Sequence, residues 1–451
     1  MKQAYKKFSP FQVDPDKVWA EYNLNDSSFA PATESEKESM VEIRKSVSYW
    51  RDAARRFKRN TVSMVALVVF IVMLFFAFLG PALIPYDYSR QYRNAQKLGP
   101  FEYSEQEALV KSLEGKVDCM YATALRPGSS TGLEPRDYYF KHKGKVYGFS
   151  IDNKLANVVI VLKDGELSVV NESDINNGEI MTSTPLEYTD EIAEDAKELE
   201  VVTKVFPHMV GTDSQGRDIL ARTMYGARVS IIIGIVAALI VLIIGSIYGA
   251  ISGLCGGVVD FVLMRIVELI YSIPEVLIVL LLQVVLKDPL QSWFDSSNTW
   301  FANALSTLGA GIVSIFITFA VLYWVTMARI VRGQVLMLKK QEYVTAATAL
   351  GASNGRIIRR HLLPNCVGQL VITTCLQIPS AIFLESFLSF LGLGVSAPMA
   401  SLGSLCSDAL GTITIFPYRL LFPGMILTII VLSLNLVGDG LRDALDPRLK
   451  K

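Results

Sequence analysis

Six long apolar runs limit what this chain of 451 residues can fold into. A helix needs about 20 predominantly apolar residues to cross the hydrocarbon core of a bilayer. The runs approach or exceed this length: Thr61–Ile84, Val229–Leu254, Val262–Leu286, Ile312–Ala328, Val367–Val395 and Leu420–Val437. Nearly uncharged runs recur too often for the core of one soluble protein. The pattern therefore predicts an all-α polytopic membrane protein with six transmembrane helices.

Composition and motif content exclude several other classes. The chain holds 43 basic and 43 acidic residues, a balance that disfavours a nucleic-acid-binding protein, because such proteins usually carry a basic excess. Its five cysteines form no CxxC pair, so neither a disulfide framework nor a zinc site is indicated. His142, His208 and His361 lie far apart and no HExxH motif occurs. We therefore expect no metal site and no catalytic residue in this chain.

Basic residues cluster beside three of the apolar runs. Cytoplasmic flanks of transmembrane helices are enriched in lysine and arginine. Clusters precede the first run at residues 51–59, separate the fourth run from the fifth at 329–360, and close the chain at 442–451. Six crossings place all three clusters on one side of the membrane. We expect a multi-pass protein with both termini, and the loop at about 329–366, in the cytoplasm.

Residues 1–60 are expected to form a cytoplasmic tail. The segment Val41–Asn60 has apolar residues that can face lipid and arginines that can face lipid phosphates, as in an amphipathic helix on the inner membrane surface. A simple basic anchor that sets the topology explains the same residues equally well. The following run, 61–84, is too long and begins too far along the chain for a cleaved signal peptide.

An insertion of about 120 residues, 87–207, separates the first two runs and is expected outside the membrane. Its composition resembles that of a soluble domain, with a predicted helix at 104–113. Predicted strands share alternating apolar residues and cover 145–151, 158–163 and 166–171. Asp164-Gly165 between the last two is a hairpin signal. We expect a small extracellular α+β domain, and a structural cap remains as plausible a role as any binding role.

The cytoplasmic loop between the fourth and fifth runs predicts a helical elbow. Glu342–Leu350 is rich in alanine and favours a helix, and Gly351 follows where a left-handed C-cap belongs. Ser353 is a good N-cap for a second helix to about Arg360, which Pro364 is expected to stop. Small side chains would leave one face of the first helix open to a partner. A plain solvated loop is the simpler alternative on local physics alone.

This elbow resembles the EAA loop of ABC-importer permeases in its oligopeptide and dipeptide form, the OppC/DppC type. That loop typically reads E-Y/F-V-x-A-A-x-x-L-G-A-S, followed by a basic helix that ends H-x-L-P-N. The matching residues are Glu342, Tyr343, Val344, Ala346, Ala347, Leu350, Gly351, Ala352, Ser353, His361, Leu363, Pro364 and Asn365. Thr345 stands where the family has the glutamate of its name-giving triplet. The resemblance implies that the loop 342–365 couples the chain to an ATPase.

Further segments resemble the same family, over residues of about 45–86 and 206–450. They share the family's flanks of the first span, its E…LSFLGLG segment that begins at Glu385, and its cytoplasmic tail 438–448. The outer-surface segment GTDxxGRD contributes Gly211, Thr212, Asp213, Gly216, Arg217 and Asp218. The insertion is longer than the family usually carries. The resemblance implies the type I permease fold, with a permease core over residues 208–451.

The chain has no GxxxxGK[ST] phosphate loop, so it cannot bind and hydrolyse ATP in the usual way. The resemblance implies that ATP and Mg are bound by two partner ATPase subunits, and that this chain itself holds no cofactor. It also implies a second homologous permease subunit, an extracellular peptide-binding protein, a peptide substrate and the cell membrane of a prokaryote. No nucleic acid is expected as a partner.

Charged residues within the spans are functional candidates by default, because an intramembrane charge is costly. Glu268 and Glu385 would line the translocation path or pair across helices. The segment Gly211–Asp218 is expected to be a turn before an interfacial helix, Gly216–Tyr225. The alternative function is a secondary transporter or channel driven by an ion gradient. The elbow disfavours it, because such a transporter needs no helix that docks on an ATPase.

Overall fold

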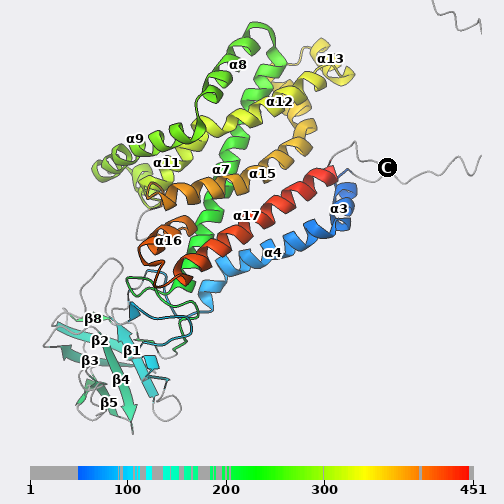
Figure 1. Cartoon of the computed structure of the whole chain (residues 1–451). Helices are drawn as coiled ribbons and strands as arrows, with labels where there is room; N and C mark the ends of the chain where they lie inside the picture. The colour runs from blue at the N-terminus through cyan, green and yellow to red at the C-terminus, as the bar shows by residue number, and fades with distance from the viewer. Residues whose placement is uncertain are drawn as a thin grey trace, which may run out of the picture. The chain divides into compact units, whose positions relative to one another are not determined.

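The computed structural model of the chain is helical over most of its described length (Figure 1). The described residues run from 49 to 445, with breaks that lie mostly between residues 90 and 204 and otherwise at 298 and 396–398. The α-helices are α3 (Tyr49–Arg59), α4 (Thr61–Phe78), α7 (Ile219–Cys255), α8 (Gly257–Ser272), α9 (Glu275–Ser296), α10 (Trp300–Ser306), α11 (Ala310–Thr318), α12 (Trp324–Leu338), α13 (Glu342–Ala349), α14 (Asn354–Ile357), α15 (Leu363–Phe390), α16 (Leu402–Ala409) and α17 (Tyr418–Leu445). Short 3₁₀ or π segments are η2 (Gly80–Ala82), η4 (Phe319–Tyr323), η5 (Ile358–Leu362) and η6 (Leu410–Thr412).

Six helical stretches among the described residues are long and apolar enough to cross a membrane. They are Thr61–Phe78, Ile219–Cys255, Glu275–Ser296, Ala310–Leu338, Asn354–Phe390 and Tyr418–Leu445. The fourth joins α11 to α12 through η4, and the fifth joins α14 to α15 through η5. The predicted all-α membrane fold with six spans is confirmed. The second, fourth and sixth helices extend beyond their predicted runs at both ends, whereas the first ends at Phe78 and does not reach the predicted Ile84.

The third predicted span, Val262–Leu286, has the wrong bounds. The backbone leaves the helix at Ile273, which is extended with φ −91° and ψ 138°, and helix α9 begins after Pro274. A residue that precedes proline is disfavoured in the α region, and proline has no backbone N–H to continue the helix. The run is therefore divided between α8 and α9, and only α9 qualifies as the span.

Helix α7 packs against α12 and α15, while α17 packs against α4 and α15 (Figure 1). The largest buried apolar cluster combines side chains of α7, α11, α12, α15 and the elbow, with Ile315, Phe319 and Met327 among the fully buried residues. A second cluster joins α4, α7, α15 and α17 through residues such as Ile231, Ile382 and Ile430. These two clusters hold the long helices together.

Glycines on α7 bring its backbone against α12. A Cβ on Gly245 would lie 2.6 Å from Cβ of Met327, and a Cβ on Gly253 would lie 2.9 Å from Cβ of Val335. A Cβ on Gly249 would overlap the carbonyl oxygen of Ala328. Helices in membranes associate mainly by such close packing of small residues, because lipid offers no hydrophobic drive between helices.

The segment between α4 and α7 contains two small sheets. The first has the strand order β6-β5-β4-β1-β9 and the second has the order β7-β3-β2-β8. Their strands are β1 (Asp118–Thr123), β2 (Arg136–His142), β3 (Lys145–Ile151), β4 (Asn157–Lys163), β5 (Glu166–Val170), β6 (Ser183–Pro185), β7 (Glu187–Tyr188), β8 (Lys197–Glu198) and β9 (Val201–Val202). All pairs are antiparallel except β2 with β8.

The three strands predicted from the sequence correspond to β3, β4 and β5. Lys163 pairs with Glu166, as expected for strands joined by a two-residue hairpin, but residues 164–165 themselves lie outside the described residues. In the helix predicted at 104–113, the described residues 107, 108, 110 and 111 are helical. Of the predicted amphipathic segment Val41–Asn60, helix α3 covers Tyr49–Arg59, and residues 41–48 lie outside the described residues.

Replacing Gly249 by leucine should separate α7 from α12. The added side chain meets the backbone of Ala328, which cannot turn away as a flexible side chain would. Overpacking of a close-packed interior typically costs about 1–3 kcal/mol. We expect a markedly lower melting temperature for the purified Gly249→Leu protein. Gly333→Leu is the matched control, because nothing lies within 4 Å of a Cβ on Gly333; equal melting of the two variants would contradict the packing argument.

Candidate functional site

The elbow begins with α13 and ends that helix in a Schellman motif. Gly351 has a φ of +78°, and its N–H donates to the carbonyl of Thr348 at 3.0 Å. The N–H of Ala352 donates to the carbonyl of Ala347, also at 3.0 Å. These two bonds satisfy carbonyls that the helix end would leave free. The predicted helix and its left-handed glycine cap are confirmed.

One face of helix α13 packs against the rest of the chain, and the opposite face is exposed. Val344 is buried, in the same apolar cluster as Ile357, Leu362 and Cys366. Ala346 is exposed, and the side chain of Leu350 is 88% exposed. A large apolar side chain held this far into solvent, at the end of a rigid helix, offers a partner apolar area that would be removed from water on docking.

The second half of the elbow differs from the sequence prediction. Pro364 does not stop a helix; instead α14 continues through the π segment η5 into α15, and Pro364 lies in the first turn of α15. Proline is tolerated there, because it lacks only an N–H that a helix start leaves unbonded. Ser353 occupies the predicted N-cap position, but its side chain makes no capping hydrogen bond.

Two side chains of α15 and η5 hold α13 in place. Nδ2 of Asn365 donates to the hydroxyl of Tyr343 at 3.2 Å and to the carbonyl of His361 at 2.6 Å. The rings of Tyr343 and His361 lie 6.4 Å apart, centroid to centroid. The elbow is thus joined directly to the helix that forms the fifth span.

An ion pair that sequence reasoning missed lies near the other end of the elbow. Arg332 on α12 donates two hydrogen bonds to the carboxylate of Asp260 on α8, each of 2.6 Å. The hydrogen bonds from Arg332 lower the pKa of Asp260 to about 2. Nζ of Lys339 donates to the carbonyl of Gly253 at 2.8 Å, so the end of α12 is also bonded to the end of α7. Arg332 and Asp260 lie far apart in the sequence and share no motif, so the sequence alone does not predict that they pair.

The segment Gly211–Asp218 starts with a turn and continues into α7. Gly211 has a φ of +81°, and a Cβ there would lie 2.6 Å from the carbonyl oxygen of Leu98. Thr212 pairs with Asp218, whose carboxylate accepts from the N–H of Ala221 at 2.7 Å and caps α7. The predicted separate interfacial helix at 216–225 is wrong, because α7 runs without a break from Ile219 to Cys255.

A buried histidine connects this turn to the preceding segment. Nδ1 of His208 lies 2.7 Å from Oδ2 of Asp218, and its Nε2 lies 3.3 Å from Oε2 of Glu107. Burial alone would lower the pKa of His208, but the hydrogen bonds to Asp218 and Glu107 outweigh it and raise this pKa to about 9. The ring also stacks on Tyr86 at 4.4 Å. His208 and Glu107 were absent from the predicted site, since no motif links them.

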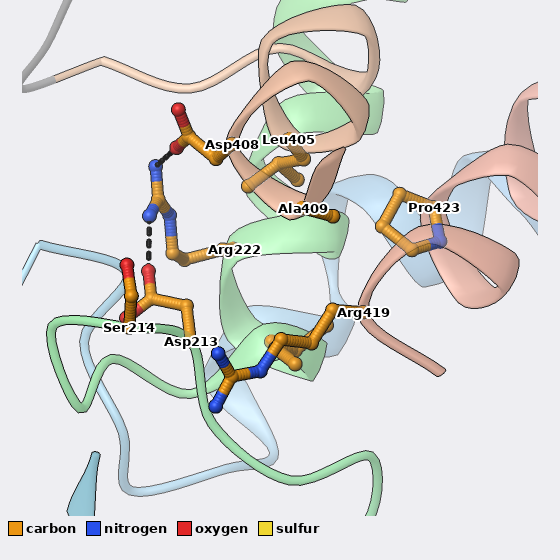
Figure 2. Close-up of a pocket in the computed structure, with 9 residues that line it drawn as sticks. Asp213, Ser214, Arg222, Leu405, Asp408, Ala409, Arg419 and Pro423 are labelled. Carbon is orange, nitrogen blue, oxygen red and sulfur yellow. Dashed lines mark hydrogen bonds and ion pairs between the residues drawn. The ribbon is translucent and has the colours of Figure 1, made fainter. Parts of the chain in front are cut away.

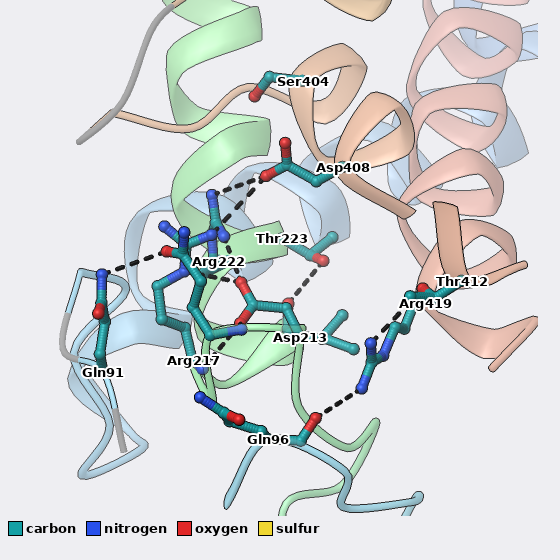
Figure 3. Close-up of polar contacts among 12 residues, drawn as sticks. Gln91, Gln96, Asp213, Arg217, Arg222, Thr223, Ser404, Asp408, Thr412 and Arg419 are labelled. Atoms are coloured by element: carbon teal, nitrogen blue, oxygen red, sulfur yellow. Dashed lines mark hydrogen bonds and ion pairs between the residues drawn. The ribbon is translucent and has the colours of Figure 1, made fainter. Parts of the chain in front are cut away.

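Asp213 is the centre of a second charged cluster (Figure 3). Its carboxylate accepts from Nε of Arg217 at 2.7 Å and from a terminal nitrogen of Arg222. Burial would raise the pKa of Asp213, but the two guanidinium groups hold it below its usual value. Asp408 on α16 lies 3.7 Å from Arg217 and 3.5 Å from Arg222, so the cluster spans two helices. The structure brings together Asp213 and Arg217 of the predicted motif and adds Arg222 and Asp408.

The two predicted intramembrane acids have different surroundings. Glu385 on α15 is fully buried, and its carboxyl group accepts from Ser230 on α7 and from Ser389, each at 2.7 Å. It therefore bonds across two helices of its own chain. Glu268 on α8 is exposed and forms an ion pair of 2.5 Å with Arg265, one turn before it. The structure does not bring these two acids together.

Two family profiles match the chain. The profile described as "Binding-protein-dependent transport system inner membrane component" matches residues 242–451. The profile described as "N-terminal TM domain of oligopeptide transport permease C" matches residues 48–100. Between them they cover helices α3, α4 and α8–α17, together with the elbow and the C-terminal part of α7.

Several curated proteins are similar to the chain. It is 43% identical over 244 residues to the oligopeptide transport system permease protein OppC of Bacillus subtilis, which covers 54% of this chain and 73% of that protein. It is 45% identical over 241 residues to OppC of Escherichia coli K12, covering 53% and 72%. The dipeptide transport system permease protein DppC of Lactococcus lactis is 31% identical over 402 residues, covering 89% and 91%. The match to the Lactococcus protein covers 89% of this chain, so it must include much of segment 87–207. The insertion is therefore not confined to this chain.

The paired histidine makes the stability of the chain depend on pH in a defined direction. A pKa raised in the folded state contributes stability below the ordinary value of about 6.5, and this stability is lost as pH rises through about 9. We expect the melting temperature of the purified protein to fall by a few degrees between about pH 7 and pH 10. His208→Gln should melt lower at pH 7 and show a smaller fall; an identical pH dependence of variant and parent would contradict the assignment.

Proposed function

Because the chain belongs to the family of OppC/DppC peptide permeases, the inner-membrane components of binding-protein-dependent transport systems, we propose that it is one permease subunit of an ATP-driven importer of oligopeptides. It forms the translocation path with a second, homologous permease. Separate ATPase subunits supply the energy, and the loop 342–365 is the point at which they act. The observation that carries this proposal is the exposed helix α13, with its apolar tip at Leu350.

The attachment of the elbow supports its role in coupling. Helix α13 follows α12 directly and is hydrogen-bonded to α15 through Tyr343 and Asn365. A push on α13 by an ATPase therefore reaches the fourth span through the short turn 339–341 and the fifth span through the Tyr343–Asn365 hydrogen bond. The Asp260–Arg332 pair and the Lys339–Gly253 bond extend this connection to α8 and α7. The glutamate that the family has at position 345 is not needed for these contacts, since the Thr345 side chain donates locally, to the carbonyl of Gln341 at the N-cap of α13.

The division of labour between subunits follows from the residues that the chain has. ATP and Mg bind to the two partner ATPase subunits, because the sequence carries no phosphate loop. The extracellular peptide-binding protein delivers the peptide to the outer face, where the 87–207 insertion and the turn at 211–218 are placed by the proposed topology. The exposed apolar side chains of α8 and α9, among them Leu269 and Leu281, meet lipid or the second permease.

Substituting alanine for Gly351 tests the coupling role. A side chain at a φ of +78° is strained by roughly 1 kcal/mol, while no atom lies within 4 Å to clash with the new Cβ. We expect peptide uptake by the complete transporter to fall severalfold, with normal amounts of protein in the membrane. Gly355→Ala is the matched control in the same elbow, because that position is equally open and has no positive φ. If both variants take up peptide at the parental rate, the coupling assignment is wrong.

Cysteine labelling in intact cells tests the proposed orientation. In a chain whose five native cysteines are replaced by alanine, single cysteines are introduced at Lys141 on β2 and at Gly355 in the elbow, both exposed positions. An impermeant thiol reagent should modify the cysteine at 141 and leave the one at 355 unmodified until the membrane is permeabilised. The reverse pattern of labelling would place the elbow outside and remove it from any cytoplasmic ATPase.

A further inference from the structure

A small pocket lies beside Asp213, between the starts of α7 and α17 and the helix α16 (Figure 2). The space inside it that a water-sized sphere can enter is about 20 Å³, which is room for one or two water molecules or a terminal group of similar size. Ser214 and Asp408 are exposed and form this mouth, whereas the remaining residues that line the pocket are buried. The pocket is therefore closed on its inner side and open at one edge.

Two buried arginines line the pocket and are only partly satisfied. Arg222 donates through its terminal nitrogens to Asp213 and, at 3.5 Å, to Asp408. Arg419 donates to the carbonyl of Gln96 at 2.9 Å and to the hydroxyl of Thr412 at 3.5 Å (Figure 3). The Nε atoms of both arginines are buried and have no hydrogen-bond partner among the described residues. A buried N–H without an acceptor is costly, so both atoms favour an added acceptor.

The charges around the pocket do not balance. Arg217 and Arg222 face the two carboxylates of Asp213 and Asp408. Arg419 forms no ion pair with a carboxylate among the described residues and contacts neutral oxygens and the ring of Phe416. The side chain of Arg419 is nevertheless about 95% buried. One buried positive charge is left over, and a single negative charge in the pocket would offset the cost of its desolvation.

We propose that this pocket binds the C-terminal carboxylate of the peptide substrate as the peptide reaches the outer end of the permease, an inference that rests on the proposed function. A carboxylate carries one negative charge, which matches the excess at Arg419. It is also a terminal group, so it can enter a pocket that has a single opening while the rest of the peptide stays outside. The guanidinium groups of Arg222 and Arg419 donate charge-assisted hydrogen bonds to its two oxygens.

Other anions fit the same pocket less well. The phosphodiester of a lipid carries substituents on two sides, and a pocket closed at its inner end has room for only one of them. Free phosphate carries more than one charge near neutral pH. A carboxylate side chain of the peptide-binding protein has the right charge and shape, and its binding here is an outcome that the experiment separates from binding of the peptide.

The test measures binding of trialanine and of trialanine amide to the purified full-length chain by calorimetry. The two peptides differ only in the terminal charge, so the parental chain should bind the free acid at least about tenfold more tightly. Arg419→Gln should abolish this preference, and so should Ala409→Leu, which fills the pocket and keeps every charge. Arg228→Gln is the matched control: Arg228 also donates to backbone carbonyls, of Ala77 and Phe78, but lies outside the pocket.

Three results would overturn the proposal. These are equal affinity for acid and amide, the same loss in Arg228→Gln, and inorganic phosphate or anionic lipid vesicles that displace the tripeptide completely. Binding of a peptide-binding protein that is lost in Arg419→Gln, with no binding of the tripeptide, would assign the pocket to that protein instead. Uptake by the complete transporter distinguishes failure of the pocket proposal from failure of the proposed function. Import that persists without a preference for the free acid refutes only the pocket. Import that does not require this chain refutes the permease assignment.

Discussion

The close contact between α7 and α12 is the constraint on which both ends of the molecule depend. Gly245, Gly249 and Gly253 let the two backbones approach so nearly that an added Cβ meets atoms of α12. A contact of this kind permits little independent sliding, because the side chains of α12 already fill the space that the glycines leave. The two helices are therefore expected to move together.

This contact connects two polar regions that lie at opposite ends of α7. The helix begins at the Asp218 cap, beside the Asp213–Arg222 cluster, and ends next to Gly256. Helix α12 ends at Leu338 and leads directly into the elbow, where Lys339 is bonded back to α7. The packed α7–α12 pair is a physical route by which a change at the elbow can reach the pocket beside the start of α7. The route consists of packed helices and ion pairs, and needs no flexible element.

Much of the fold follows from local sequence, since its signals lie within single segments. The six apolar runs give the six spans, Gly351 gives the end of α13, and alternation gives strands β3 to β5. Two local predictions fail because proline has more than one role. Pro274 breaks the third run into two helices, whereas Pro364 sits harmlessly in the first turn of α15.

The parts that the sequence does not reveal are contacts between distant segments. Glu107 pairs with His208, Asp408 joins the cluster at Asp213, and Arg419 reaches the carbonyl of Gln96. Each of these residues is unremarkable in its own segment. The packing of α7 against α16 brings Asp408 to Asp213, whereas Glu107 and Gln96 lie in the segment that precedes α7. The motif at 211–218 indicates the region of the charged cluster, but its spacing does not indicate that Arg419 has no carboxylate partner among the described residues.

The proposed coupling requires α13 to dock against an ATPase, and cross-linking from Leu350 measures this directly. A photoreactive amino acid placed at Leu350, the most exposed apolar side chain of the elbow, is irradiated in the purified complete transporter during peptide import. If α13 docks there, a covalent adduct with an ATPase subunit is expected, and its yield changes when ATP is added. An importing transporter in which this position forms adducts only with lipid, or with the second permease, would contradict it.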